Sequence, residues 1–297
     1  MVLDTLLDSA AARLNDHAVS VVIGLAALAL LAERVTRATV VAGHKRRPWS
    51  RVWTTNGALL GCALTTSWIM SPWLSPAFSN ALSAQTGVLV WLNVAQLSYT
   101  TSILLGVLLL DFMIYSLHRL LHAVPLFWRL HQVHHSDADM NASTHFRQHP
   151  LQLVLAPLLQ LPLLWLLGVS GVSWVLYAAI STAIQLWQHA DLRPSPRLDR
   201  WLLPIFVTPT MHCVHHHHRR QFHDTNYGAL FSFWDRLLGT YTATPPDIRL
   251  GLNRHDGHRA THHTSFVECL WMPFQSSPMP AAKAASHKFQ MHFRGKK

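Results

Sequence analysis

Long apolar stretches separated by polar segments dominate the first two thirds of the chain. Apolar runs cover residues 18–32, 52–70 and 100–117, and a further run over 151–188 is interrupted by the small-residue sequence GVSG. Most of these runs approach the ~20 residues that a helix needs to cross a hydrocarbon core of ~30 Å. The pattern therefore predicts three membrane-spanning helices followed by a helical hairpin with GVSG as its turn.

Two regions depart from this alternation. Residues 81–117 are apolar over a length that exceeds one bilayer core, so we expect an amphipathic or re-entrant piece over 82–98 before the third span. The sequence SPWLSPAFS (71–79) is expected to end the second helix, because proline removes a backbone donor. The chain beyond 189 is mostly polar, and we expect a poorly ordered tail from roughly residue 275.

Composition and charge support a membrane protein and suggest its orientation. Half of the 297 residues are apolar and 13% are charged, whereas a soluble domain carries about a quarter of charged residues. The formal net charge is +10. Basic residues cluster between the first two apolar runs, at Arg34, Arg37, Lys45, Arg46, Arg47 and Arg51. The positive-inside rule places that loop in the cytoplasm, so we expect a multi-pass protein of a bacterial inner (plasma) membrane.

The same count of spans places the histidine-rich segments on the cytoplasmic side, as a cap over the membrane helices. The basic residues do not form a groove-like block with aromatics, so we expect no nucleic-acid partner. Three cysteines lie far apart without a C-x-x-C spacing and predict no disulfide framework.

Histidine is the unusual residue of this sequence, with 22 occurrences. Nine of them fall in four segments, namely His118 and His122, then His131, His134 and His135, then His189, and finally His212, His215 and His216. Residues three or four apart on a helix share a face, so each cluster can present several imidazoles to one ion. Because about four or five imidazoles saturate an ion, nine predict two metal sites. Imidazole suits Zn, Cu, Fe and Ni alike, so the ligands alone do not name the metal.

Four further residues are candidates beside these nine. His149, at the start of the predicted hairpin, is a possible additional ligand. Asp111 shares a helix face with His118, and an acid at that depth either pairs with a ligand histidine or hydrogen-bonds a neighbouring span. Asn226 and Asp235 are expected to support the cap around the ligands. We expect no catalytic side chain beyond the metal ligands.

The motifs occur in one order over roughly residues 100–241: H-x3-H, H-x2-HH, RQHPL, a second H-x2-HH, NYG and FWDRLLGTY. In this order they resemble the fatty acid hydroxylase/sterol desaturase superfamily of membrane di-iron oxygenases. The resemblance implies an all-α membrane protein whose cytosolic histidine-rich cap holds two iron ions, with O2 as co-substrate and a lipid as substrate. No cytochrome b5-like sequence accompanies the motifs, so we expect an external electron donor such as a cytochrome b5-like protein, a ferredoxin or a reductase.

These observations divide the chain into N-terminal spans with a basic loop (1–99), a histidine-box catalytic domain (100–241) and a polar, partly disordered extension (242–297). The expected reaction is hydroxylation or desaturation of a lipid C–H bond, and sterol, fatty acyl, sphingoid, alkylglycerol and carotenoid substrates all fit. The alternative is a membrane protein that transports or stores metal, or keeps a structural zinc, without oxygenase activity. Few polar residues thread the predicted spans, which argues against transport.

Overall fold

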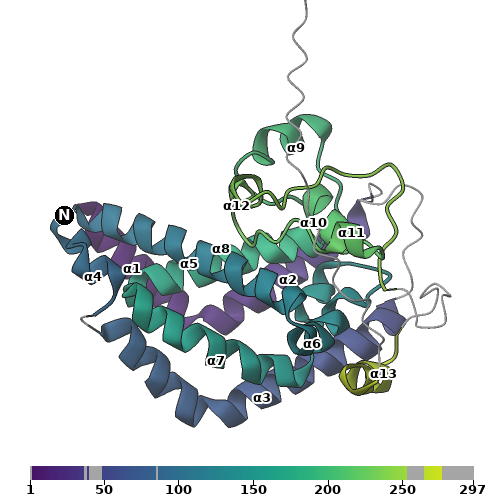
Figure 1. The fold of residues 1–297 in the computed structure, drawn as a ribbon, viewed down its shortest axis with the longest axis horizontal. Coiled ribbons are helices and arrows are strands. Elements are labelled where there is room, and N and C mark those ends of the chain that lie inside the picture. The colour runs from purple at the N-terminus through teal and green to yellow at the C-terminus, as the bar shows by residue number, and fades with distance from the viewer. Residues whose placement is uncertain (1, 37–38, 40–48, 85, 253–263, 276–297) are drawn as a thin grey trace, which may run out of the picture.

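The chain folds into helices and loops, as a computed structural model of residues 2–36, 39, 49–84, 86–252 and 264–275 shows (Figure 1). Within these ranges the extended pairing consists of two isolated bridges, Phe206 with Phe231 and His217 with Leu250, and there are no strands. This confirms the predicted all-α class. Most of the predicted basic loop, and the tail after 275, lie outside the described residues.

The N-terminal part begins with α1 (Val2–Asp16) and α2 (Ala18–Val35), and α2 covers the first predicted span. The second apolar run forms one long helix, α3 (Trp49–Ser83), which passes through both prolines of SPWLSPAFS. The expectation that this sequence ends the helix is therefore wrong. Pro72 offers no N–H to the carbonyl of Trp68, but the hydroxyl of Ser71 donates to that carbonyl at 2.9 Å.

Two short helices separate α3 from the third predicted span. They are α4 (Val88–Trp91) and the 3-10 helix η1 (Val94–Gln96), in the region where an amphipathic or re-entrant piece is predicted. α5 (Tyr99–Ala123) then begins at Ser98, whose hydroxyl accepts a hydrogen bond from the backbone N–H of Thr101. The predicted start of this helix is thus confirmed. The helix continues beyond residue 117, and this continuation carries His118 and His122.

The predicted hairpin is confirmed as α7 (Pro150–Leu167) and α8 (Gly171–His189). Its turn requires Gly168, which has a φ of +67° and whose added Cβ would lie 2.3 Å from the carbonyl oxygen of Thr86. α5 packs along α8, and α3 packs along α7 (Figure 1). Buried residues from these helices and from the cap share one apolar core, among them Ala81, Leu110, Met113, Leu164, Tyr177 and Leu230.

Short helices complete the structure around the C-terminal ends of α5 and α8. They are α6 (Pro125–His135), η2 (Ala142–Phe146), α9 (Pro196–Leu202), α10 (Pro209–His215), α11 (Arg220–His223), α12 (Phe233–Leu237), α13 (Phe266–Trp271) and η3 (Met272–Phe274). Helices α9 to α12 gather on one side of the long helices and form the cap (Figure 1). Among the described residues, α5 and α7 have the length and hydropathy of membrane-spanning helices. The remaining predicted spans stay predictions.

Candidate metal centre

Five histidines from three helices form the first group of converging imidazoles. Their ligand atoms all lie within 4.8 Å of one another. The members of this five-histidine group are His118 and His122 from α5, His131 and His135 from α6, and His215 from α10. Four of these rings are buried and His118 is partly buried. Residues nearly a hundred positions apart thus meet at one point.

Four more histidines form the second group, again within 4.8 Å of one another. The members of this four-histidine group are His134 from α6, His189 from the end of α8, and His212 and His216 from α10 and its C-cap. The Nε2 atom of His189 lies 3.1 Å from that of His134 and 3.0 Å from that of His212. The Nε2 atom of His216 lies 3.2 Å from that of His212. All nine predicted histidines are therefore brought together, in two groups.

Each H-x2-HH sequence divides its rings between both groups. In α6, His131 and His135 enter the five-histidine group, while His134 enters the other. The second copy does the reverse, since His215 alone enters the five-histidine group. The division follows from helix geometry: neighbours in sequence point about 100° apart, whereas positions i and i+4 share a face. α6 and α10 thus lie between the two groups.

Hydrogen bonds fix the ring orientation of most of the five-histidine group. The Nδ1 atom faces an oxygen in four of the five rings: Tyr227 O for His118 (2.9 Å), Asp224 Oδ1 for His122 (3.2 Å), Gln152 Oε1 for His131 (3.3 Å) and Thr225 O for His215 (2.8 Å). An oxygen acceptor requires a proton on Nδ1, which leaves the lone pair on Nε2. In each of these four rings that Nε2 atom is buried without a hydrogen-bond partner. Ligating histidines are oriented in this way by the partner of their other nitrogen.

The four-histidine group has fewer such partners. The Nδ1 atom of His189 donates to the carbonyl of Gln185 at 2.7 Å. The Nδ1 atoms of His134, His212 and His216 are buried without a partner among the described residues. The two groups therefore differ in how firmly the surrounding chain fixes their tautomers.

The ring nitrogens of both groups are suited to bind metal ions. A neutral imidazole nitrogen carries either a proton or a lone pair, so the chain of Nε2 contacts through His189 and His212 cannot be hydrogen-bonded in series. Nitrogens bound at ~2.0–2.1 Å to one ion would stand roughly 3.0–3.4 Å apart, depending on the coordination geometry. The observed separations of 3.0 to 3.2 Å match this spacing. Shared cations would satisfy nitrogens that are otherwise buried and unpaired.

Burial keeps these rings neutral, which is the ligating form. Burial, and then the neighbouring imidazoles, hold the pKa well below the ordinary value of 6.5 for six histidines of the cap and α6: His131, His134, His135, His212, His215 and His216. Burial also lowers the pKa of the nearby His145 to about 4. A neutral ring offers its lone pair without first losing a proton.

The predicted support residues act on the loop that carries Tyr227. Asp235 accepts hydrogen bonds from the backbone N–H of Tyr227 (2.7 Å) and of Gly228 (2.8 Å), and from the hydroxyl of Thr240 (2.6 Å). Asn226 adopts a φ of 58° and donates to the carbonyl of Met211 at 3.2 Å. These bonds place the Tyr227 carbonyl that orients His118. Asp235 and Asn226 therefore act on the ligands through this loop and not by direct contact with a histidine.

Asp111 holds the cap to the long helices and does not contact a ligand histidine. Its carboxylate is buried and accepts from the backbone N–H of Leu230 (3.0 Å) and Phe231 (3.1 Å), from the hydroxyl of Tyr177 (3.1 Å) and from the indole of Trp234 (2.9 Å). Of the two readings open from the sequence, the geometry favours the one in which Asp111 hydrogen-bonds a neighbouring span, since Tyr177 belongs to α8.

His149 lies apart from both groups, and both of its ring nitrogens are engaged by backbone. Its Nδ1 atom accepts from the N–H of Leu151 as the N-cap of α7, and its Nε2 atom lies 3.2 Å from the carbonyl of Leu270. Sequence reasoning missed two residues that do contact ligand rings, Asp224 and Gln152. The available signals were an acid next to a histidine-rich segment and a glutamine directly after RQHPL.

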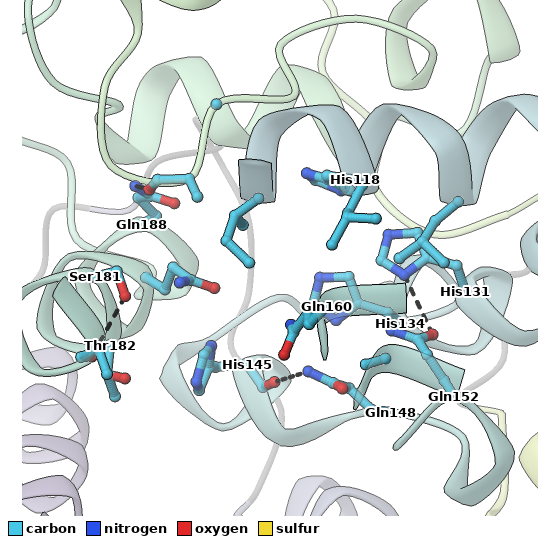
Figure 2. Close-up of a pocket in the computed structure, with 18 of the residues that line it drawn as sticks. His118, His131, His134, His145, Gln148, Gln152, Gln160, Ser181, Thr182 and Gln188 are labelled. Carbon is cyan, nitrogen blue, oxygen red and sulfur yellow. Dashed lines mark hydrogen bonds between the residues drawn. The ribbon is translucent and has the colours of Figure 1, made fainter. Parts of the chain in front are cut away.

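A cavity of about 310 Å³ adjoins both groups and extends between α5, α7 and α8. His118 and His131 of the first group, and His134, His189 and His212 of the second, line it. Figure 2 shows the rings of His118, His131 and His134 on one side of the cavity, and Ser181, Thr182 and Gln188 of α8 on the other. Substrate can therefore approach both groups from the same space.

Comparison with known proteins gives the same family as the motifs. Residues 103–240 match the family model described as fatty acid hydroxylase. The chain is 30% identical over 191 residues to the human protein named alkylglycerol monooxygenase, a match covering 62% of this chain and 40% of that protein. It is 34% identical over 146 residues to ornithine lipid hydroxylase OlsE of Rhizobium tropici, covering 48% of this chain and 42% of that protein. It is 30% identical over 131 residues to mouse lathosterol oxidase, covering 44% and 42%.

These relatives are lipid hydroxylases, monooxygenases and a sterol oxidase, and the chain spans about two fifths of their length. No solved structure gives a significant match. The family match covers the segment from α5 to α12, which supplies all nine converging histidines. Residues 103–240 therefore belong to the fatty acid hydroxylase family, within the fatty acid hydroxylase/sterol desaturase superfamily.

Proposed function

We propose that the protein is a membrane-bound non-haem di-iron oxidoreductase that hydroxylates or desaturates a C–H bond of a lipid, using O2 and external electrons. The observation that carries the proposal is the convergence of nine histidines, eight of them buried, into two adjacent groups whose ligand nitrogens lack other partners. The resemblance to lipid monooxygenases supplies the reaction type.

The side chains would hold and orient the metals. The five-histidine group would bind one iron ion and the four-histidine group the other, and bound iron would supply O2 activation and hydrogen abstraction. Tyr227, Gln152 and Asp224 keep the protons of their partner rings on Nδ1, so that Nε2 faces the metal.

The cavity would hold the lipid chain next to both groups. Its walls include Ile114, Leu117 and Leu121 on α5, which favour an alkyl chain and exclude water from the reacting C–H bond. Since α5 and α7 have the properties of membrane-spanning helices, a lipid would reach the cavity from the bilayer. We further propose several membrane spans, a cytoplasmic cap and a bacterial inner-membrane location, with a separate ferredoxin, reductase or cytochrome b5-like donor.

Metal analysis and lipid analysis together test this function. The purified full-length protein is expected to contain about two iron ions per chain and to consume O2 when a lipid and reductant are present. Lipids of a strain lacking the protein, compared with the complemented strain, should reveal a species that gains one oxygen atom or loses two hydrogens. His122→Ala and His212→Ala, one in each group, should abolish that product. Zinc without iron, or an iron-loaded protein that changes no lipid, would refute the proposal.

A further inference from the structure

The cavity next to the histidines has a polar side that the metal centre does not use. Gln160 on α7, and Thr182 and Gln185 on α8, face it. Across the described residues these three side chains make no hydrogen bond. The amide oxygen of Gln188, which also lines the cavity, is buried and has no partner. Figure 2 shows Gln160, Thr182 and Gln188 around the same space as the labelled histidines.

These polar groups lie where apolar side chains would be expected. α7 has the hydropathy of a membrane span, and amides within such helices are costly unless a partner satisfies them. Gln152, Ala156 and Gln160 follow one another at intervals of four residues, so they form one stripe of α7 that faces the cavity. On α8, Ala178, Thr182 and Gln185 form the facing stripe. The two small residues leave room between the amides.

Among the described residues, the lining of the cavity includes no Asp, Glu, Lys or Arg. An ionised head group beside α7 and α8 would leave water without an opposite charge on the surrounding side chains, which is far more costly than moving an uncharged polar group there. Amides and a hydroxyl can instead both donate to and accept from a hydroxyl, ether or amide. This side of the cavity therefore favours an uncharged polar group over an ionised one.

We propose that the cavity binds a lipid through an uncharged hydrogen-bonding group (a hydroxyl, ether or amide) held by Gln160, Thr182 and Gln185 while the alkyl chain lies against α5. This inference rests on the proposed function, since it assigns the substrate class of the same site. One helical turn separates Gln185 from His189. The polar group of the lipid is therefore held close to the metal centre, and it enters the cavity together with the alkyl chain.

Chain-matched ligands test the proposal by binding, without turnover. The full-length protein in detergent and without reductant is titrated with hexadecanol, hexadecanamide, hexadecane and hexadecanoate, the last at a pH where its carboxylate is ionised. Native mass spectrometry measures occupancy and thermal unfolding measures stabilisation. We expect hexadecanol and hexadecanamide to bind at least tenfold more tightly than hexadecanoate and hexadecane. Equal binding of hexadecanoate and hexadecanol would overturn the proposal.

Two variants assign the contact to the named side chains. Gln160→Leu and Thr182→Val should each weaken hexadecanol binding about two- to tenfold, as expected for loss of one hydrogen bond, and should leave hexadecane binding equal or stronger. The matched controls are Gln96→Leu and Thr65→Val, exposed positions outside the cavity, which should bind as the unaltered protein does. Unchanged hexadecanol binding in both cavity variants would refute the assignment. If a variant does not fold, the ligand series on the unaltered protein still decides.

The outcomes separate this inference from the proposed function. An iron-loaded protein that oxidises lipids but prefers hexadecanoate would refute only the substrate class. A protein that binds hexadecanol selectively but holds no iron and oxidises no lipid would refute only the oxygenase.

Discussion

Replacing Asp224 tests whether partners of the unbound ring nitrogens control the metal centre. Its Oδ1 atom accepts from Nδ1 of His122 at 3.2 Å, and its Oδ2 atom accepts from Nε of Arg220 at 2.7 Å. Asp224→Asn keeps an oxygen acceptor but removes the charge, and a charge-assisted bond exceeds a neutral one by about 1 kcal/mol. Because the side chain is 29% exposed, solvent screens part of that difference. We therefore expect the five-histidine group to bind its metal about two- to threefold more weakly.

Asp224→Ala removes the acceptor altogether and should cost more. Loss of such an oriented contact typically lowers metal affinity 10–100-fold, or about 1.4–2.7 kcal/mol. The assay is competition between the protein and a chelator of known affinity, followed by metal content per chain. The matched control is Asp247→Asn, because Asp247 also pairs with an arginine, Arg249, but is exposed and touches no ligand ring. Unaltered metal affinity in Asp224→Ala, or an equal loss in the control, would refute the reasoning.

Three further outcomes are expected. Asp235→Ala leaves the buried N–H groups of Tyr227 and Gly228 unpaired, so thermal unfolding should show a loss of about 3–5 kcal/mol; a change no larger than that of Asp247→Ala would contradict it. In the metal-free protein, the lowered pKa of rings such as His134 and His216 means that the unfolded chain binds more protons below about pH 6.5. Stability should therefore fall as pH drops below that value, by up to ~1.4 kcal/mol per pH unit for each such ring, whereas a thermal midpoint that is level from pH 7 to pH 5 would argue against buried neutral rings. The first equivalent of metal should occupy the five-histidine group, whose tautomers are better fixed. Spectroscopy of His118→Ala and His189→Ala, which each alter one group, identifies the signal of each group; equal occupancy of the two groups at half loading would contradict this order.

Much of this site could be predicted from residue spacing, because helix periodicity alone brings i, i+3 and i+4 to one side. The convergence of His118 with His215 also followed, since both lie on the predicted cytoplasmic side. Helix geometry separates the neighbouring rings of each H-x2-HH, but the group that each ring joins could not be predicted, because it depends on how α6 and α10 cross. The partner of each Nδ1 atom was equally out of reach, since a sequence does not specify which backbone carbonyl a loop presents.

The fold shows the same limit at single residues. The alternation of apolar runs and turns gave α5 and the α7–α8 hairpin, where pattern and packing agree. It did not give the length of α3, because one hydroxyl, that of Ser71, compensates for the donor missing at Pro72. The role of Asp111 was left between two readings because its four donors come from α8, α12 and the loop before α12, whose proximity only the tertiary structure reveals.

The shared use of α6 and α10 makes the two histidine groups structurally interdependent. A shift of either helix would displace ligands of both groups at once, so a change in α6 or α10 cannot convert the centre into an intact mononuclear site. Among the helices that supply ligands, α5 (His118 and His122) and α8 (His189) each contribute to one group only. Mononuclear forms of this protein should therefore result from substitutions in α5 or α8 alone. The two shared helices, α6 and α10, should tolerate the fewest substitutions.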